Sequence, residues 1–559
     1  MLNQILVILF FSFSTAYAQD TGWTISNAGG GTSLGLDVET DTDGNVYTFG
    51  SFTGTVDLDP SSNVAQLNAI VGETPCYIAK YDAAGNYLWS KKLSGVVFAQ
   101  DLLAQDSQGN VLIALSFQDS LIDLNGNIYY SLAGSMDIGI LKLDGDGNQL
   151  WIKFTQTNTL ERFFCMKVDN QDHILLNGVF TSTLDVDFGP GMELISPAGS
   201  FDEFVLKLDE LGDFMWVQTW YGGLDEVQMN GERMDIVDMA IDTSRNVWLT
   251  GYFNTTIDFD PTSGDFTVQN TTNDFRAFAL KLDQSGNFLW AKTFASTMEI
   301  SSAEIGVNEQ NEAVIGGVYQ GTVQLGSETF YSPDNQNAYL LKMDENGTTQ
   351  WARNIQCQGI SGISALEVLS TGVIQFAGVF HDTIYFMSQT IGRQLIPVNP
   401  IDTYCAWYTN SGDVKWVTRF EGSESVIILD ITKGSDDTVA MTGYYKGIID
   451  FNLGSSVENE TSQNIDRGFV KKMYFDPSIS LGLEEEEMHL SYTNPVNDYL
   501  FYQSDATIEN ASIFSLDGSL VRELTNPVGE IDFRGIHSGV YLVHFKSGKG
   551  MLTARIVHL

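Results

Sequence analysis

Three short segments of the chain carry two aspartates separated by a single residue, a spacing that can bring two carboxylates to one cation. Ca²⁺ takes about six to eight oxygen ligands, and carboxylates are common among them. No segment supplies a full ligand set, so an acidic turn is the preferred interpretation and a calcium site is the alternative. The residues are Asp57 and Asp59, Asp185 and Asp187, and Asp258 and Asp260. We expect no other cofactor.

A long insertion between two repeats, residues 220–233, offers aromatic and charged side chains for binding. Variable loops on a rigid scaffold commonly carry recognition. We expect ligand contacts from Trp220, Tyr221, Glu226 and Arg233, and the alternative is a longer solvated loop. The ligand would be an extracellular protein or glycan.

Catalytic motifs give little support for an enzyme. The chain has no His-Glu-x-x-His motif and no Walker phosphate loop, and only His173 and His381 of its six histidines precede residue 488. We therefore expect a binding scaffold without catalytic activity. The alternative is a secreted glycan hydrolase or lyase with its site in a central funnel.

These groups are positioned by a unit that returns every 61 to 74 residues. Each unit has a strand ending in Gly-x-aromatic, then a turn in which glycine precedes tryptophan by four residues. Short β-branched and aromatic runs between Gly, Asn and Asp predict four antiparallel strands per unit. The pairs are Gly85–Trp89, Gly147–Trp151, Gly212–Trp216, Gly286–Trp290, Gly347–Trp351 and Gly412–Trp416.

Seven copies of this unit predict an all-β, seven-bladed β-propeller over residues 19–475. The seventh copy lacks its fourth strand, while an unassigned Trp23 precedes the first copy. We expect the N-terminal strand to complete the last blade and close the ring, which removes exposed sheet edges.

The repeat tryptophans and lysines are interpreted as structural. A sugar-stacking surface is the alternative for the tryptophans, but a position that recurs in every blade serves what every blade needs, so we expect inter-blade packing. Lysine precedes five of the six tryptophans by nine residues, and a structural ion pair or a solvated face is expected there. In the sixth unit Trp407 replaces this lysine.

The turns also predict two different faces. In a four-stranded blade, the turns between strands one and two and between strands three and four share one face. Here they are short and uniform. The longer loops between strands two and three share the opposite face with the inter-blade connections, so we expect binding on that variable-loop face.

The net charge disfavours nucleic acid as a partner, and the N-terminal residues predict export. With 28 basic and 71 acidic residues, the net charge of −43 disfavours nucleic acid. Residues 1–18 have the apolar run and small-residue cleavage pattern of a signal peptide, and no later run has the length of a transmembrane segment. The four cysteines are separated in sequence, and we expect them to be buried and unpaired rather than in disulfides.

Beyond the repeats, residues 476–487 form an acidic linker and residues 488–559 a small second β domain, expected to be a β-sandwich. We expect a monomer.

Two resemblances to known families refine these expectations. Residues 20 to 475 resemble the SBBP family of seven-bladed propeller repeats in exported bacterial proteins, through the Asp-x-x-Gly-Asn-x-x-Trp motif and the preceding Lys-Leu-Asp. This resemblance implies a fold and not an activity.

The C-terminal residues resemble the type A sorting domain of the type IX secretion system of Bacteroidota. The resemblance implies handling by that secretion machinery, removal of the domain, and release or attachment at the outer-membrane cell surface. The matching residues include Asn494, Pro495, Asp517, Gly518, Gly539 and Tyr541.

Overall fold

The computed structural model contains β-strands and no helix among the residues it describes, so the predicted all-β class is confirmed. The predicted signal peptide and the predicted acidic linker lie outside these residues. The described residues are 22–97, 102–131, 135–155, 161–199, 202–221, 234–272, 274–387, 392–434, 438–451, 459–462, 465–474, 490–492, 498–504, 507–515, 520–547 and 550–558.

Contacts divide the chain into two compact units that separate between Ser478 and Ile479. The larger region contains seven sets of four antiparallel strands, here called sets 1 to 7. In chain order, sets 1 to 3 are β2 (Ser33–Thr40), β3 (Val46–Phe52), β6 (Cys76–Tyr81) and β7 (Tyr87–Val97); β8 (Leu103–Gln105), β9 (Val111–Ile122), β11 (Met136–Leu143) and β12 (Gln149–Phe154); and β13 (Glu161–Val168), β14 (Ile174–Phe180), β17 (Asp202–Leu208) and β18 (Phe214–Tyr221).

The remaining sets follow the same order, except that the last takes its fourth strand from the N-terminus. Sets 4 to 7 are β19 (Met234–Ile241), β20 (Val247–Phe253), β23 (Arg276–Leu282) and β24 (Phe288–Phe294); β25 (Glu299–Val307), β26 (Ala313–Leu325), β27 (Glu328–Met343) and β28 (Thr349–Cys357); β29 (Ser361–Val368), β30 (Ile374–Phe380), β33 (Asp402–Tyr408) and β34 (Val414–Arg419); and β36 (Val426–Lys433), β37 (Thr438–Tyr445), β40 (Arg467–Tyr474) and β1 (Trp23–Ser26).

Short additional strands extend the loops between strands two and three of most sets. They are β4 (Thr55–Asp57), β5 (Gln66–Asn68), β10 (Ile128–Tyr130), β15 (Leu184–Asp185), β16 (Leu194–Ile195), β21 (Ile257–Asp258), β22 (Thr267–Val268), β31 (Ile384–Met387), β32 (Gly392–Leu395), β38 (Ile448–Asp450) and β39 (Asn459–Thr461). One more, β35 (Glu421–Gly422), lies in the connection between sets 6 and 7 and pairs with β38.

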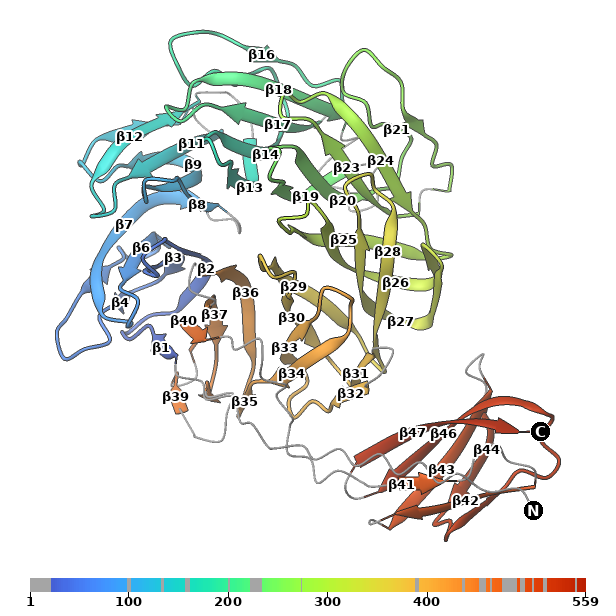
Figure 1. Ribbon diagram of the computed structural model, residues 1–559. Coiled ribbons are helices and arrows are strands. Elements are labelled where there is room, and N and C mark those ends of the chain that lie inside the picture. Colours follow the sequence, from blue (N-terminus) through green and yellow to red (C-terminus); the bar gives the residue numbers. More distant parts are fainter. Residues whose placement is uncertain are drawn as a thin grey trace. The chain divides into compact units, whose positions relative to one another are not determined.

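The first strand of each set, here called the inner strand, lies nearest a common centre (Figure 1). Each inner strand contacts the next along the chain, and β36 contacts β2. The Asp37 Oδ2 atom accepts a hydrogen bond from the Leu103 amide at 2.7 Å, which links sets 1 and 2. Asp430 Oδ2 accepts the Val38 amide at 2.8 Å, which links set 7 to set 1 in the same way.

The N-terminal strand completes set 7, as the orphan tryptophan predicted. Strand β1 pairs antiparallel with β40, and Trp23 lies opposite Lys472 (Figure 1). These partners lie more than 400 residues apart, so the pairing joins the two ends of the repeat region.

The Asp-x-x-Gly-Asn motif forms its turn through the aspartate side chain. Asp82 Oδ1 accepts the amides of Ala84 and Asn86 at 2.9 and 2.8 Å, and the Asn86 side chain donates to Asp82 Oδ2 at 2.8 Å. Gly85 has a φ of 85°, a left-handed conformation that glycine adopts without steric cost. Each part of the motif therefore has a local structural role.

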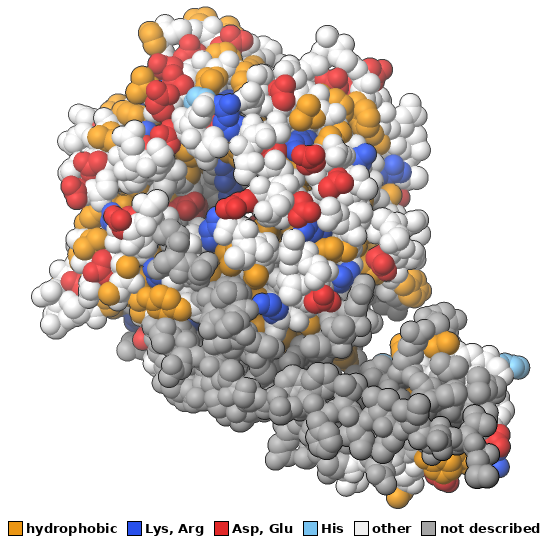
Figure 2. All heavy atoms as spheres, in the orientation of Figure 1, with side chains coloured by type: hydrophobic (Ala, Val, Ile, Leu, Met, Phe, Trp, Pro, Cys, Tyr) orange, Lys and Arg blue, Asp and Glu red, His pale blue; other side chains and the backbone are white. Residues whose placement is uncertain are grey.

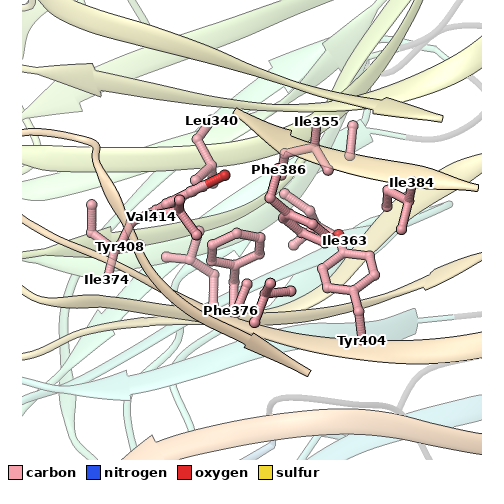
Figure 3. Packing of buried hydrophobic residues seen from close by; sticks show 14 of the residues in the cluster. Leu340, Ile355, Ile363, Ile374, Phe376, Ile384, Phe386, Tyr404, Tyr408 and Val414 are labelled. Atoms are coloured by element: carbon pink, nitrogen blue, oxygen red, sulfur yellow. The ribbon is translucent and has the colours of Figure 1, made fainter. Parts of the chain in front are cut away.

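Apolar residues fill the spaces between neighbouring sets. One core cluster combines side chains of sets 5 and 6, including Leu340, Ile355, Phe376 and Tyr404 (Figure 3). All four cysteines are buried and none is in a disulfide, in agreement with the sequence-based expectation.

The C-terminal region has two sheets that share one apolar core. Leu500 and Ile531 of the first sheet cluster with Ile513, Val543 and Phe545 of the second. The strands are β41 (Leu490–Tyr492), β42 (Tyr499–Ser504) and β45 (Glu530–Asp532) in the first sheet, and β43 (Ile508–Ser515), β44 (Leu520–Thr525), β46 (Gly539–Ser547) and β47 (Gly550–His558) in the second.

Candidate functional site

The repeat lysines form ion pairs with an acid in the first turn of their own set. Lysine and acid side chains are largely buried in most of these pairs, so the structural interpretation is confirmed. Burial would raise the pKa of Asp106, Asp169 and Asp242, but hydrogen bonds from the lysines and nearby amides outweigh it and lower the pKa. The pairs are Lys80–Asp41 at 3.3 Å, Lys142–Asp106 at 2.9 Å, Lys207–Asp169 at 2.8 Å, Lys281–Asp242 at 2.8 Å and Lys342–Glu312 at 2.6 Å.

The repeat tryptophans connect neighbouring sets. Trp89 Nε1 and Lys80 Nζ of set 1 both donate to the Gly145 carbonyl of set 2, each at 3.1 Å. The Trp89 ring covers Gly147, where a Cβ would lie 2.9 Å from it. Trp23 of set 7 likewise donates to the Ala83 carbonyl of set 1 at 3.1 Å. Most of these rings are half-buried at the joints rather than enclosed in the core.

The three Asp-x-Asp segments organise their own loops. Asp57 Oδ1 accepts the Asp59 and Ala65 amides at 3.3 and 2.9 Å, and Asp59 Oδ1 accepts the Ser61 amide at 2.9 Å. Asp185 with Asp187, and Asp258 with Asp260, repeat this pattern. No group of three or more His, Cys, Asp or Glu side chains in the described ranges is arranged to hold a metal ion. The acidic-turn interpretation accounts for these contacts, and calcium binding stays a prediction.

Of the four predicted ligand contacts, the structure places one side chain. Trp220 is 3% exposed and donates from Nε1 to the Phe259 carbonyl at 3.3 Å, so its ring packs in the protein instead of facing a ligand. Tyr221 ends β18 with its backbone opposite Asp202. The Tyr221 side chain, Glu226 and Arg233 lie outside the described residues.

Among the predicted sorting residues, Gly539 begins β46, and the buried Tyr541 hydroxyl donates to the His537 carbonyl at 2.7 Å. Asn494, Pro495, Asp517 and Gly518 lie outside the described part of the chain.

A serine motif that the sequence interpretation overlooked is structural. Gly31-Thr-Ser33-Leu-Gly35 has the Gly-x-Ser-x-Gly spacing of hydrolase nucleophiles. Ser33 is 3% exposed, and its Oγ accepts the Gly468 amide at 3.0 Å. It lies within strand β2 and not in the sharp strand-to-helix turn that exposes such a nucleophile.

A group that sequence reasoning missed gathers at the ends of inner strands β2, β29 and β36. This group, here called the Glu39 cluster, consists of Glu39, Glu367, Thr432 and Lys433. Lys433 Nζ lies 3.3 Å from Glu367 Oε1, and Thr432 Oγ1 donates to Glu39 Oε2 at 3.4 Å.

Acidic and basic side chains are intermixed over the visible face of the larger region (Figure 2).

The Glu39 cluster breaks the repeat. In each set, one inner-strand residue lies opposite the strand-two residue that also pairs with the strand-three lysine, or with Trp407 in set 6. The side chain at this inner-strand position differs from set to set. An alignment of inner strands by this register would have revealed the break. In order, the residues are Glu39, Ala104, Lys167, Ala240, Gly306, Glu367 and Thr432.

Burial and neighbouring charges shift the pKa values of Glu39 and Lys433 in the cluster. Burial raises the pKa of Glu39 to about 8; Lys167 opposes this effect, and the charges of Asp430 and Glu367 add to it. The Glu367 carboxylate raises the pKa of Lys433, against the opposing effect of burial. A protonated Glu39 beside a charged pair can donate and accept hydrogen bonds with a polar ligand.

Glu203 is a second break in the repeat. It is fully buried at a strand-three position that holds Cys76, Ile138, Ala277, Ala338, Thr403 and Gly468 in the other sets. Burial, with Asp235 and Asp202 nearby, raises its pKa well above the ordinary value, against a small opposing effect of the Ile236 amide. The protonated form of this carboxyl group is therefore favoured by its surroundings.

Comparison with known families identifies the C-terminal region. Residues 491–558 match the secretion system C-terminal sorting domain. This match indicates type IX secretion to the cell surface or extracellular space, and handling by the type IX machinery. Within the described residues, none forms a helix of the length and apolarity needed to cross a membrane.

The chain is also similar to a distantly related protein. An uncharacterized WD repeat-containing protein of Acanthamoeba polyphaga mimivirus is 22% identical over 497 residues, which covers 74% of this chain and 35% of that protein. The chain thus spans about a third of that relative's length.

Among solved structures, Sqt1 of Chaetomium thermophilum is 10% identical with a TM-score of 0.38, covering 82% of this chain and all of that one. A puromycin hydrolase S511A mutant complexed with PGG is 9% identical with a TM-score of 0.39, covering 92% and 58%. A Bacteroides caccae protein of unknown function is 8% identical with a TM-score of 0.29, covering 70% and 94%. These scores are too low to support an argument from likeness.

Proposed function

We propose that residues 22–474 form a closed seven-bladed β-propeller of the SBBP type that acts outside the cell as a binding scaffold. Support for closure comes from the β1–β40 pairing and from the Asp430–Val38 and Trp23–Ala83 hydrogen bonds. The protein acts as a monomer, and its ligand is an extracellular protein or glycan.

The observation that carries the binding function is the Glu39 cluster. Polar residues that recur in the sets are engaged in turns and joints, so they are not available to a ligand. Glu39, Glu367 and Lys433 instead differ from set to set and meet where the inner strands of sets 1, 6 and 7 converge. Convergent polar groups that depart from a repeat are typical of a site.

The test is a screen of the full secreted chain on glycan and protein arrays, with and without Ca²⁺. We expect Glu39→Gln and Glu367→Gln to weaken binding to the ligand found. Glu424→Gln is a matched control, because Glu424 forms an exposed ion pair with Lys446 at 3.4 Å outside the cluster. Equal binding by all three variants and the wild type would show that the cluster is not the site.

A glycan hydrolase or lyase is the second candidate, favoured by one observation. Burial raises the pKa of Glu39 to about 8, and a second carboxyl group of the cluster, Glu367, lies 3.3 Å from Lys433 Nζ. A carboxyl group with a raised pKa can act as a general acid when a second carboxyl group in the same site acts as the base.

This candidate predicts release of reducing ends from a polysaccharide, with a loss of activity as the pH rises through about 8. Glu39→Gln and Glu367→Gln should each lower the rate at least about 100-fold. Absence of product from a broad set of polysaccharides, with ligand binding retained, would leave only the scaffold.

A further inference from the structure

A hollow of about 190 Å³ lies between sets 4 and 5, apart from the Glu39 cluster. Its main walls are Tyr252 on β20, Phe275 just before β23, Glu299 at the start of β25 and Gln336 on β27. These positions end strand two, precede strand three or begin an inner strand. The hollow therefore opens on the variable-loop face.

The aromatic walls form a fixed corner. The Tyr252 and Phe275 rings meet edge to face, with centroids 5.3 Å apart and planes at 89°. The Ile300 amide donates to the Phe275 carbonyl at 3.2 Å, which ties the start of β25 to this corner. The aromatic faces are thus positioned before any ligand arrives.

These walls depart from the repeat. Phe275 occupies a position that is Thr74, Met136, Gln336, Ile401 or Asp466 in the other sets where it is described. The sequence has phenylalanine at this position in set 3 as well, but there strand two has Val179 where set 4 has Tyr252. The pair of aromatic residues is therefore not part of the packing that recurs in the sets.

The size and charge of the hollow restrict the class of ligand that it can bind. The volume of the hollow is several times the roughly 30 Å³ that one water molecule occupies, but it is smaller than the roughly 300 Å³ of a drug-sized pocket. One small ring therefore fits. An aromatic corner offers an apolar face to such a ring, while the exposed Glu299 and Gln336 offer hydrogen bonds. The Glu299 carboxylate and the net charge of −43 disfavour an anionic ligand.

We propose that this hollow binds one sugar ring of an extracellular glycan, either uncharged or amino-substituted, through the Tyr252–Phe275 corner, Glu299 and Gln336. The inference rests on the proposed binding function and adds a site and a ligand class to it. Binding a single ring at the open face leaves the rest of the polysaccharide free to extend across the variable loops.

Calorimetric titration of the full chain with hexamers of β-1,4-linked glucose, β-1,4-linked glucosamine and α-1,4-linked galacturonic acid tests the proposal. We expect glucose or glucosamine hexamers to bind and galacturonate not to bind. Phe275→Ala should weaken binding at least about tenfold. Glu299→Gln should reduce affinity for glucosamine more than for glucose, because only glucosamine carries a positive charge.

Tyr130→Ala is the matched control, since Tyr130 is a 65% exposed aromatic residue of set 2, and its binding should equal that of the wild type. If Phe275→Ala does not fold, the hexamer affinities of Glu299→Gln and Gln336→Ala test the site instead, because both of these residues are exposed. Preferred binding of galacturonate, no binding of any hexamer, or affinities unchanged in every hollow variant overturns the proposal. A ligand lost in Glu39→Gln but kept in all hollow variants overturns this site alone and leaves the proposed function intact.

Discussion

The two ends of strand β17 carry ionisable side chains with opposite surroundings. At the short-turn end, Lys207 is 1% exposed and lies 2.8 Å from Asp169, as the equivalent lysines of other sets lie beside their acids. Near the variable-loop end, Glu203 is fully buried, and neither carboxyl oxygen has a side-chain or backbone hydrogen-bond partner within standard geometry among the described residues.

The difference separates residues that stabilise the fold from residues that cost stability. A buried ion pair that recurs in five sets satisfies its own charges, whereas a single buried carboxyl without a partner is unfavourable. Natural proteins keep such local violations mainly where function requires them. The repeat-breaking positions are therefore better functional candidates than the repeated ones.

The largest effect is expected from breaking the recurring pair. Lys207→Met leaves the Asp169 charge buried beside an apolar side chain, and we expect a loss of about 3–5 kcal/mol in the free energy of unfolding. Urea unfolding of the full chain at pH 7 measures this loss.

The pair also gives a pH signature. Because Lys207 helps lower the pKa of Asp169, the wild type keeps this contribution above the ordinary aspartate pKa and loses it as the pH falls through the lowered value. Lys153→Met is the control. Lys153 Nζ lies 2.6 Å from Asp213, whose side chain is 52% exposed, so we expect the free energy of unfolding to change by less than about 1 kcal/mol. Equal losses in both variants would remove the distinction between buried and exposed pairs.

Glu203→Gln tests the opposite end of the strand. A raised pKa means that the unfolded chain releases the Glu203 proton at a lower pH than the folded chain, so the wild type loses stability as the pH rises above about 4.5. The loss approaches about 1.4 kcal/mol per pH unit until the folded-state pKa is reached. Glutamine does not titrate, so thermal unfolding at pH 4 and pH 8 should show a gain at pH 8 only. A pH-independent difference would contradict the assignment.

The smallest effect compares two glycines of set 2. Gly109 and Gly147 have φ values of 75° and 78°, so Ala should cost each about 1–2 kcal/mol through the left-handed backbone. A Cβ at Gly109 would meet nothing within 4 Å, but at Gly147 it would meet the Trp89 ring at 2.9 Å. We expect Gly147→Ala to cost about 1–3 kcal/mol more than Gly109→Ala by chemical unfolding. Equal costs would mean that the ring moves aside freely.

Much of the fold could be predicted because local rules recur in every set. The aspartate, glycine and asparagine of the turn each have a contact within five residues, so their spacing predicts the turn without tertiary information. The role of Trp23 was also predictable, because a repeat with one missing strand requires a partner from elsewhere.

The candidate site was less accessible to sequence. Trp220 has the residue type of a ligand contact, yet its burial was decided by packing against set 4. Glu39 and Glu367 are ordinary surface residue types in the sequence, and only the convergence of distant strands brings them to one cluster.

The sequence by itself determined the all-β class, the repeating unit, its turns and the C-terminal sorting domain, because these depend on short-range backbone preferences and on motifs with fixed spacing. Only the tertiary structure decided which acid pairs with each repeat lysine, how each tryptophan joins the next set, and where Glu39, Glu203 and the Tyr252–Phe275 corner lie. Those outcomes depend on contacts between residues far apart in the chain, and their energies come from burial, which no local pattern specifies.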